Sequence, residues 1–186
     1  MHVILVLIAA LGTSSAAAEN VKVSAGTNDI GVLEGESRLV LTLARRENFN
    51  AHSFDVAMFS AKVPSSAGVL ISHVPLFDGE TEAPVLETRE GADCVLKDFR
   101  LVSELQNYRL IVGERDFGSN FADSQIVRYT IYELTRNLEE EIGRPLHYFE
   151  RVGTRVSSQK HCDVEEAFQD DWKLSENREI VAPPAN

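Results

Sequence analysis

The sequence predicts a mainly β protein, either an antiparallel β-sandwich or a partly open barrel, with one C-terminal helix. Many short segments alternate apolar and polar residues, which is the pattern of half-buried strands. Glycine, proline and asparagine separate these segments as turn signals, and only one segment near the C-terminus has helical spacing. Because the strands do not alternate with helical segments, a nucleotide-binding fold of the βαβ type is disfavoured.

The first half of the chain supplies several of these strands. In residues 37–45, Leu39, Leu41 and Leu43 share one face. Residues 52–61 show the alternation of a half-buried strand, with larger apolar side chains at Phe54, Val56 and Met58 and small or polar ones between them. Further strands are expected at residues 21–26, 69–77 and 84–88.

The second half is more regular. Residues 124–134 form the clearest strand, with Val127, Tyr129 and Ile131 on one face and Arg128, Thr130 and Tyr132 on the other. Other strands are expected at residues 94–104, 107–117 and 145–158. The helix follows, because Asp163 is a favourable N-cap and the next apolar residues have helical spacing. These apolar residues are Val164, Ala167, Phe168 and Trp172.

The chain divides into a signal peptide at 1–18, a single β-rich domain at 19–175 and a flexible tail at 176–186. Residues 3–11 are apolar but too few to span a bilayer, and Ala16 and Ala18 form an A-x-A cleavage site. The alternative is a buried N-terminal strand. No second apolar stretch of spanning length follows, so no membrane insertion is expected after cleavage, and the protein is predicted to be periplasmic or secreted.

The only two cysteines, Cys94 and Cys162, are predicted to form a disulfide. An even cysteine count without a C-x-x-C motif favours a structural bond in an exported chain. This bond would attach the helix to the strand that begins at Cys94. The alternative is a thiolate metal site that includes His161, but an adjacent His–Cys pair is not a zinc-binding spacing.

The composition excludes several classes of partner. The formal net charge is −11 and the pI is about 4.9, so nucleic acid and anionic membrane surfaces would repel the chain. With 44% hydrophobic residues, the chain can build a packed core.

No specific catalytic motif is present in the sequence, and no metal or cofactor is predicted. The G-x-S-x-G, P-loop, H-E-x-x-H and EF-hand patterns are all missing. The S-x-x-K match at residues 157–160 has no accompanying K-T-G, and the loop at 116–123 is interpreted as a turn rather than a calcium site. A small hydrolase remains an alternative, if Asp98 and Glu114 meet in a cleft or if His52, His73 and His147 hold a metal.

Charged residues at strand ends suggest a ligand-binding or partner-binding surface. An arginine guanidinium matches a carboxylate, so such a surface would bind a small carboxylate-bearing ligand or the acidic edge of a protein partner. The alternative is a set of cross-strand ion pairs. The candidate residues are Arg45, Arg46, His52, Arg100 and Arg115.

Several stretches of the sequence are similar to a known family. They are RRENFNAHSFDVAMF, DCVLKDFRLV, LIVGERDFG, RYTIYELTRN, HYFERV and KHCDVEEAF, within residues 37–168. The chain resembles the periplasmic carbapenem self-resistance proteins, the CarG-like group, and their uncharacterised relatives. This resemblance implies an exported, β-rich protein that protects a cell without hydrolysing the antibiotic. It transfers no functional residues.

The resemblance and the residues together lead to three hypotheses. The first is a non-catalytic binding or protective protein, which is compatible with a homodimer. The second is an envelope interaction or assembly module that recruits a partner chain through an exposed strand edge. The third is the small secreted hydrolase.

Overall fold

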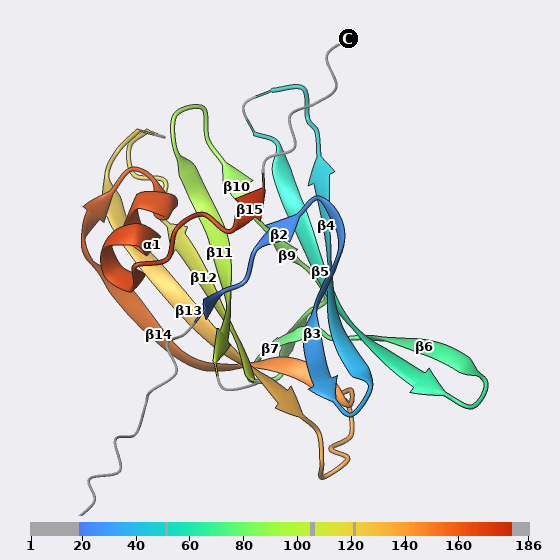
Figure 1. The fold of residues 1–186 in the computed structure, drawn as a ribbon. Helices are drawn as coiled ribbons and strands as arrows, with labels where there is room; N and C mark the ends of the chain where they lie inside the picture. Colours follow the sequence, from blue (N-terminus) through green and yellow to red (C-terminus); the bar gives the residue numbers. More distant parts are fainter. Residues whose placement is uncertain (1–18, 51, 105–106, 121, 180–186) are drawn as a thin grey trace, which may run out of the picture.

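The computed structural model describes residues 19–50, 52–104, 107–120 and 122–179 as two principal β-sheets and one helix, stacked in three layers (Figure 1). The smaller sheet packs on one face of the larger sheet, and the helix packs on the other. The sheets do not close into a barrel, so the mainly β prediction with one C-terminal helix is confirmed in its sandwich form. The predicted signal peptide, 1–18, and residues 180–186 lie outside the described residues.

The larger sheet has the strand order β1-β11-β12-β13-β14-β7-β8, with β10 beside β11. Its strands are β1 (Glu19–Asn20), β7 (Leu76–Asp78), β8 (Thr81–Ala83), β10 (Arg89–Glu90), β11 (Val95–Glu104), β12 (Asn107–Arg115), β13 (Gln125–Arg136) and β14 (His147–His161). Neighbouring strands are antiparallel except for β14 and β7, which are parallel.

The smaller sheet has the order β3-β4-β5-β6, with β9 beside β5. Its strands are β3 (Gly26–Glu34), β4 (Ser37–Arg46), β5 (Phe54–Ser65), β6 (Gly68–His73) and β9 (Leu86–Glu87). A separate parallel pair joins β2 (Val23–Ser24) to β15 (Arg178–Glu179), and the helix α1 spans Val164–Trp172. At nine residues α1 is too short to cross a bilayer, and no other helix in the described ranges could do so.

The main core lies between the two sheets. Leu39 and Leu41 from β4 face Phe99 and Leu110 from the larger sheet, and all four are fully buried. The rings of Phe59 and Phe149 close the core with their centroids 4.9 Å apart. This apolar layer accounts for the alternation that predicted the strands, because each strand turns every second residue toward the opposite sheet.

A second core forms under α1, on the outer face of the larger sheet. Val164, Ala167 and Phe168 from the helix pack on Val127 and on neighbouring apolar residues of the sheet. A glycine in β12 makes room for the helix, since a Cβ at Gly113 would lie 2.8 Å from Val164 Cγ1. The predicted helical stripe is therefore core packing.

The disulfide and the N-cap fix the start of α1, as predicted. Cys94 and Cys162 are bonded, with their Cα atoms 5.8 Å apart. The Asp163 side chain accepts a hydrogen bond from the Glu165 backbone N–H at 2.7 Å and another from Val95 N–H at 3.2 Å. The helix is therefore attached to β11 both covalently and through its cap.

At the start of β5, the face that points to the core is not the face with the larger apolar side chains. Alternation normally turns the larger side chains inward, yet Asp55 and Ala57 are buried whereas Met58 is 39% exposed. The same face continues with Phe59, which packs in the main core, and the buried carboxylate of Asp55 has ion-pair partners described below. The sequence pattern did not predict β3 as a strand. Gly31 of this strand lies against the Tyr108 hydroxyl.

The C-terminal segment differs from the predicted flexible tail at 176–186. Asn177 is fully buried and its carbonyl accepts a hydrogen bond from Val23 N–H, and Arg178 pairs with Val23 in the β15–β2 ladder. Residues 176–179 are held because the Arg178 side chain enters the protein and meets buried carboxylates.

Candidate functional site

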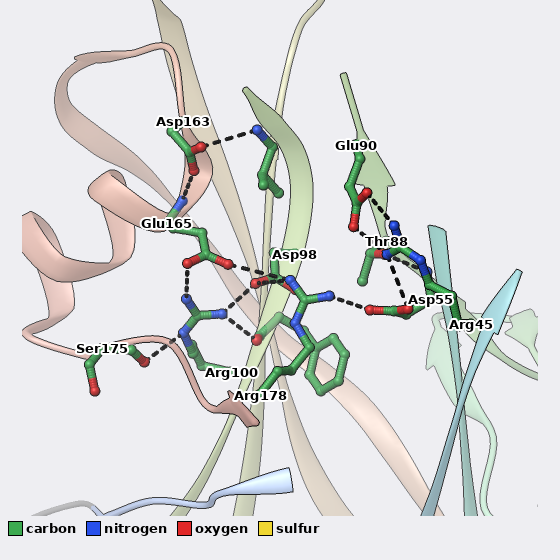
Figure 2. Close-up of polar contacts among 12 residues, drawn as sticks. Arg45, Asp55, Thr88, Glu90, Asp98, Arg100, Asp163, Glu165, Ser175 and Arg178 are labelled. Carbon is green, nitrogen blue, oxygen red and sulfur yellow. Dashed lines mark hydrogen bonds and ion pairs between the residues drawn. The ribbon is translucent and has the colours of Figure 1, made fainter. Parts of the chain in front are cut away.

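A line of charged side chains crosses the molecule from the smaller sheet to α1 (Figure 2). Four carboxylates alternate with three guanidinium groups along it. In order they are Glu90, Arg45, Asp55, Arg178, Asp98, Arg100 and Glu165, which we call the charge network.

The first half of the charge network lies at one end of the smaller sheet, where β4 ends and β5 begins. Arg45, at the end of β4, donates from Nη2 to Glu90 Oε2 at 2.6 Å and lies 3.4 Å from Asp55. The Asp55 backbone N–H donates to Thr88 Oγ1 at 2.8 Å, and the Asp55 carboxylate pairs with Arg178. The C-terminal segment is therefore bonded to β5.

The second half lies on the outer face of the larger sheet, under α1. Arg178 Nη2 lies 3.2 Å from Asp98 Oδ2, and Arg100 Nη1 donates to the same oxygen at 2.5 Å. Arg100 Nε donates to the Ser175 carbonyl at 3.0 Å, and its guanidinium stacks 4.6 Å from the Phe168 ring centroid. The side chains of Asp98 and Arg100 are completely inaccessible to solvent.

Burial and a neighbouring carboxylate of the network raise the pKa of Glu165. Burial and the neighbouring charge of Asp98 raise this pKa to about 7, and the opposing effect of Arg100 is smaller. Burial alone would lower the pKa of Arg178, but Asp98 and Asp55 outweigh it and raise that pKa overall. The network therefore holds its charges by mutual pairing, and its buried centre has no surface at which a ligand could bind.

Two of the predicted surface residues are buried, which corrects the prediction. Arg100 is the centre of the charge network, and Arg115 is 2% exposed. Arg115 donates to the backbone carbonyls of Cys162, Asp116 and Asp123, so it joins the end of β12 to two loops. Both guanidinium groups have internal hydrogen-bond partners. The sequence pattern shows only that each arginine lies near a strand end and does not show these partners.

The other predicted surface residues lie near the turn between β4 and β5. Arg46 is exposed and stacks 5.3 Å from the Phe54 ring centroid. The His52 backbone N–H donates to Asn50 Oδ1, and its carbonyl accepts from Asn48 Nδ2, which shapes the turn. The structure thus brings Arg45, Arg46 and His52 to one end of the smaller sheet, whereas Arg115 lies elsewhere.

A cleft of about 390 Å³ opens at the inner face of the larger sheet. The segment 76–87 crosses from the larger to the smaller sheet and forms one wall, which includes Leu76 and Leu86. Three alternate residues of β13 form the opposite side, namely Arg128, Thr130 and Tyr132. The alternating sequence pattern predicted that these three residues share one face of a strand. It did not show that an open space lies over that face.

Charges of both signs surround the cleft. Glu114 lies 3.5 Å from Arg89 and 3.7 Å from Lys97, so its charge is neutralised within the protein. Glu87 and Asp116 also line the cleft and carry further negative charge. Among the described residues, the side chain of Arg128 makes no hydrogen bond or ion pair, which leaves its guanidinium open to a bound molecule.

The residues of the hydrolase alternative do not meet. Asp98 lies on the helix side of the larger sheet, whereas Glu114 lines the inter-sheet cleft on the other side. His73 bonds the Pro84 carbonyl at 2.7 Å, and His147 is buried at the start of β14. No group of three or more metal-ligating side chains occurs in the part of the chain that the structure describes.

The fold and the cleft define a two-sheet sandwich with a single helix on its outer face and an open inter-sheet cleft. A solved structure described as "Crystal structure of CarG" has a similar fold, with a TM-score of 0.68. The similarity covers 85% of this chain and 99% of that one at 19% sequence identity, so it shows a common fold. No family model matches the chain, and no curated protein matches it either.

Proposed function

We propose that this protein is an exported, non-catalytic binding protein that protects the cell envelope against a carbapenem. The observation that carries the proposal is the fold that the chain shares with CarG across nearly the whole of both chains. An inter-sheet cleft of about 390 Å³ is large enough for a small molecule.

Export to an oxidising compartment is part of the proposal. The apolar segment 3–11 and the A-x-A site before Glu19 have the features of a cleaved leader. The Cys94–Cys162 disulfide supports export, because structural disulfides persist in the periplasm and outside the cell and are rare in the cytosol.

The test is expression of the chain with its leader in a carbapenem-sensitive bacterium. We expect the minimum inhibitory concentration to rise while mass spectrometry of the medium finds the antibiotic intact. A chain that starts at Glu19 and stays in the cytosol is the matched control and should give no tolerance. Tolerance accompanied by loss of the intact antibiotic would contradict a non-catalytic role, and equal sensitivity of both strains would contradict protection.

A second candidate function is recruitment of a partner chain in the envelope, and strand β6 favours it. β6 lies at the edge of the smaller sheet, and the hairpin it forms with β5 extends from the body (Figure 1). Val69, Leu70 and Ile71 are 57%, 59% and 61% exposed. Consecutive exposed apolar residues on an open edge suit the addition of a strand from another protein.

A pull-down from periplasmic extract separates the two candidates. With Leu70→Lys as the matched variant, a stoichiometric partner captured by the wild-type chain alone would support recruitment. Capture that is equal for both chains, or that is absent, would exclude this edge as the recruiting surface.

A further inference from the structure

We propose that the inter-sheet cleft binds a small organic monocarboxylate, with Arg128 holding its carboxylate and the hydroxyls of Thr130 and Tyr132 binding its other oxygens. This inference rests on the proposed function, because it gives the binding protein its site and its class of ligand. It assigns a role to polar groups of β13 that make no side-chain hydrogen bond within the described residues, although the Tyr132 ring also packs against the main core.

The first support is a row of hydrogen-bonding groups on β13. Alternate residues of a strand point to the same side and follow one another at about 7 Å, so the three side chains form a line along the cleft. None of them makes a side-chain hydrogen bond to another residue within the described ranges. By contrast, the guanidinium groups of Arg100 on β11 and Arg115 on β12 donate hydrogen bonds to backbone carbonyls of the protein.

The second support is the apolar wall opposite this row. Leu76 and Leu86 are buried residues of the inter-sheet core that also line the cleft, and Val112 lies beside them. Ligand sites typically combine such an apolar lining with a few polar groups that fix orientation. The cleft therefore suits a molecule with a compact apolar body and a polar edge.

The charges around the cleft select a single negative charge on the ligand. Arg128 lies opposite Glu114 in the β12–β13 ladder but makes no ion pair with it or with another described residue. Its planar fork matches a ligand carboxylate with two parallel hydrogen bonds. Lys97 is already paired with Glu114, while Glu87 and Asp116 would repel a second negative group on the ligand. A monocarboxylate is therefore favoured over a dianion, and a zwitterion gains from the two carboxylates when its ammonium group reaches them.

Isothermal titration calorimetry of the oxidised, exported protein tests this assignment. The probes are imipenem, a zwitterionic monocarboxylate with a bicyclic body, and N-acetyltyrosine, a monocarboxylate without a lactam ring. Succinate is the dianion control. We expect the protein to bind at least one monocarboxylate and to bind succinate at least tenfold more weakly.

The variants are chosen to keep the fold. Arg128→Met should weaken monocarboxylate binding at least tenfold, and Arg128→Lys should fall between it and the wild type because lysine keeps the charge but loses the fork. Tyr132→Phe should weaken binding several-fold. Arg38→Met, which removes a partly exposed arginine outside the cleft, should leave affinity unchanged. A folded state close to that of the wild type is confirmed for each variant by its melting temperature.

The results separate failure of the site from failure of the function. The site is overturned if Arg128→Met binds either monocarboxylate as tightly as the wild type does, or if neither monocarboxylate binds to the wild type. Both outcomes count against the site whether or not the wild type confers tolerance. If Arg128-dependent binding is observed but the wild-type chain gives no carbapenem tolerance, the site stands and the proposed protective function is wrong.

Discussion

The buried centre of the charge network, at Asp98 and Arg100, and the cleft lie on opposite faces of the larger sheet, and both contain strand arginines. On the helix side, Arg100 is covered by α1 and the C-terminal segment, and its guanidinium is used by Asp98 and Ser175. On the inter-sheet side, Arg128 lies where the two sheets leave an opening. The segment that packs over a strand therefore decides whether an arginine of that strand is structural or open to a ligand.

The largest effect is expected from breaking the charge network at its buried centre. Arg100→Met leaves Asp98 buried with one partner fewer, and removal of one member of a buried ion pair typically costs about 3–5 kcal/mol. Urea denaturation measures this loss. The matched control is Arg38→Met, which breaks the exposed pair with Asp29 and should cost less than about 1 kcal/mol. Similar losses in both variants would show that the network does not hold the layers together.

The next effect concerns the covalent attachment of α1. Replacing both Cys94 and Cys162 by alanine removes a bond between residues 68 positions apart, and we expect about 2–4 kcal/mol of lost stability. Thermal unfolding of the double variant, compared with the oxidised and reduced wild type, measures it. Reduced wild type should resemble the variant, and an unchanged melting temperature would contradict a stabilising bond.

A smaller effect is expected where the helix packs on β12. Gly113→Ala places a methyl group 2.8 Å from Val164 Cγ1, so the helix must shift and the cost should be about 1–3 kcal/mol. Gly153→Ala is the control, since a Cβ there meets nothing within 4 Å. The difference in denaturation midpoint between the two variants isolates the overpacking, and equal midpoints would contradict it.

The smallest effect is a pH dependence on the helix side. The folded-state pKa of Glu165 is about 7, above its ordinary value, so the folded protein retains a proton that the unfolded chain releases. The stability that Glu165 contributes should therefore fall as pH rises from about 4.5 to 7 and level off above. Denaturation midpoints across this range would show a shallower slope for Glu165→Gln than for wild type. Glu166→Gln, one residue along the helix, should keep the wild-type slope.

Much of the fold was predictable because it depends on local patterns. The alternation in β4 and β13, the Asp163 cap and the only cysteine pair each gave a correct element or bond. The inverted face of β5 was not predictable, because Asp55 is buried only through partners that are distant in sequence, such as Arg178.

The candidate site was less predictable than the fold. Sequence patterns group charged residues by their position on a strand, and this grouping joined the buried Arg100 and Arg115 with the exposed Arg46. Arg128 was recognised as a member of a strand face but not as a site residue. Its environment depends on the segment 76–87, whose path between the sheets is set by pairings far along the chain.

The position of Arg178 has a consequence for how the molecule assembles. Its partner Asp55 lies 123 residues earlier, and β15 adds to β2 from the opposite end of the described chain. Contacts of such long range require large loops to close, which costs conformational entropy. The two halves of the charge network can therefore join only after the C-terminal segment has been synthesised. A protease that removed this segment would separate the two halves without cutting any long strand.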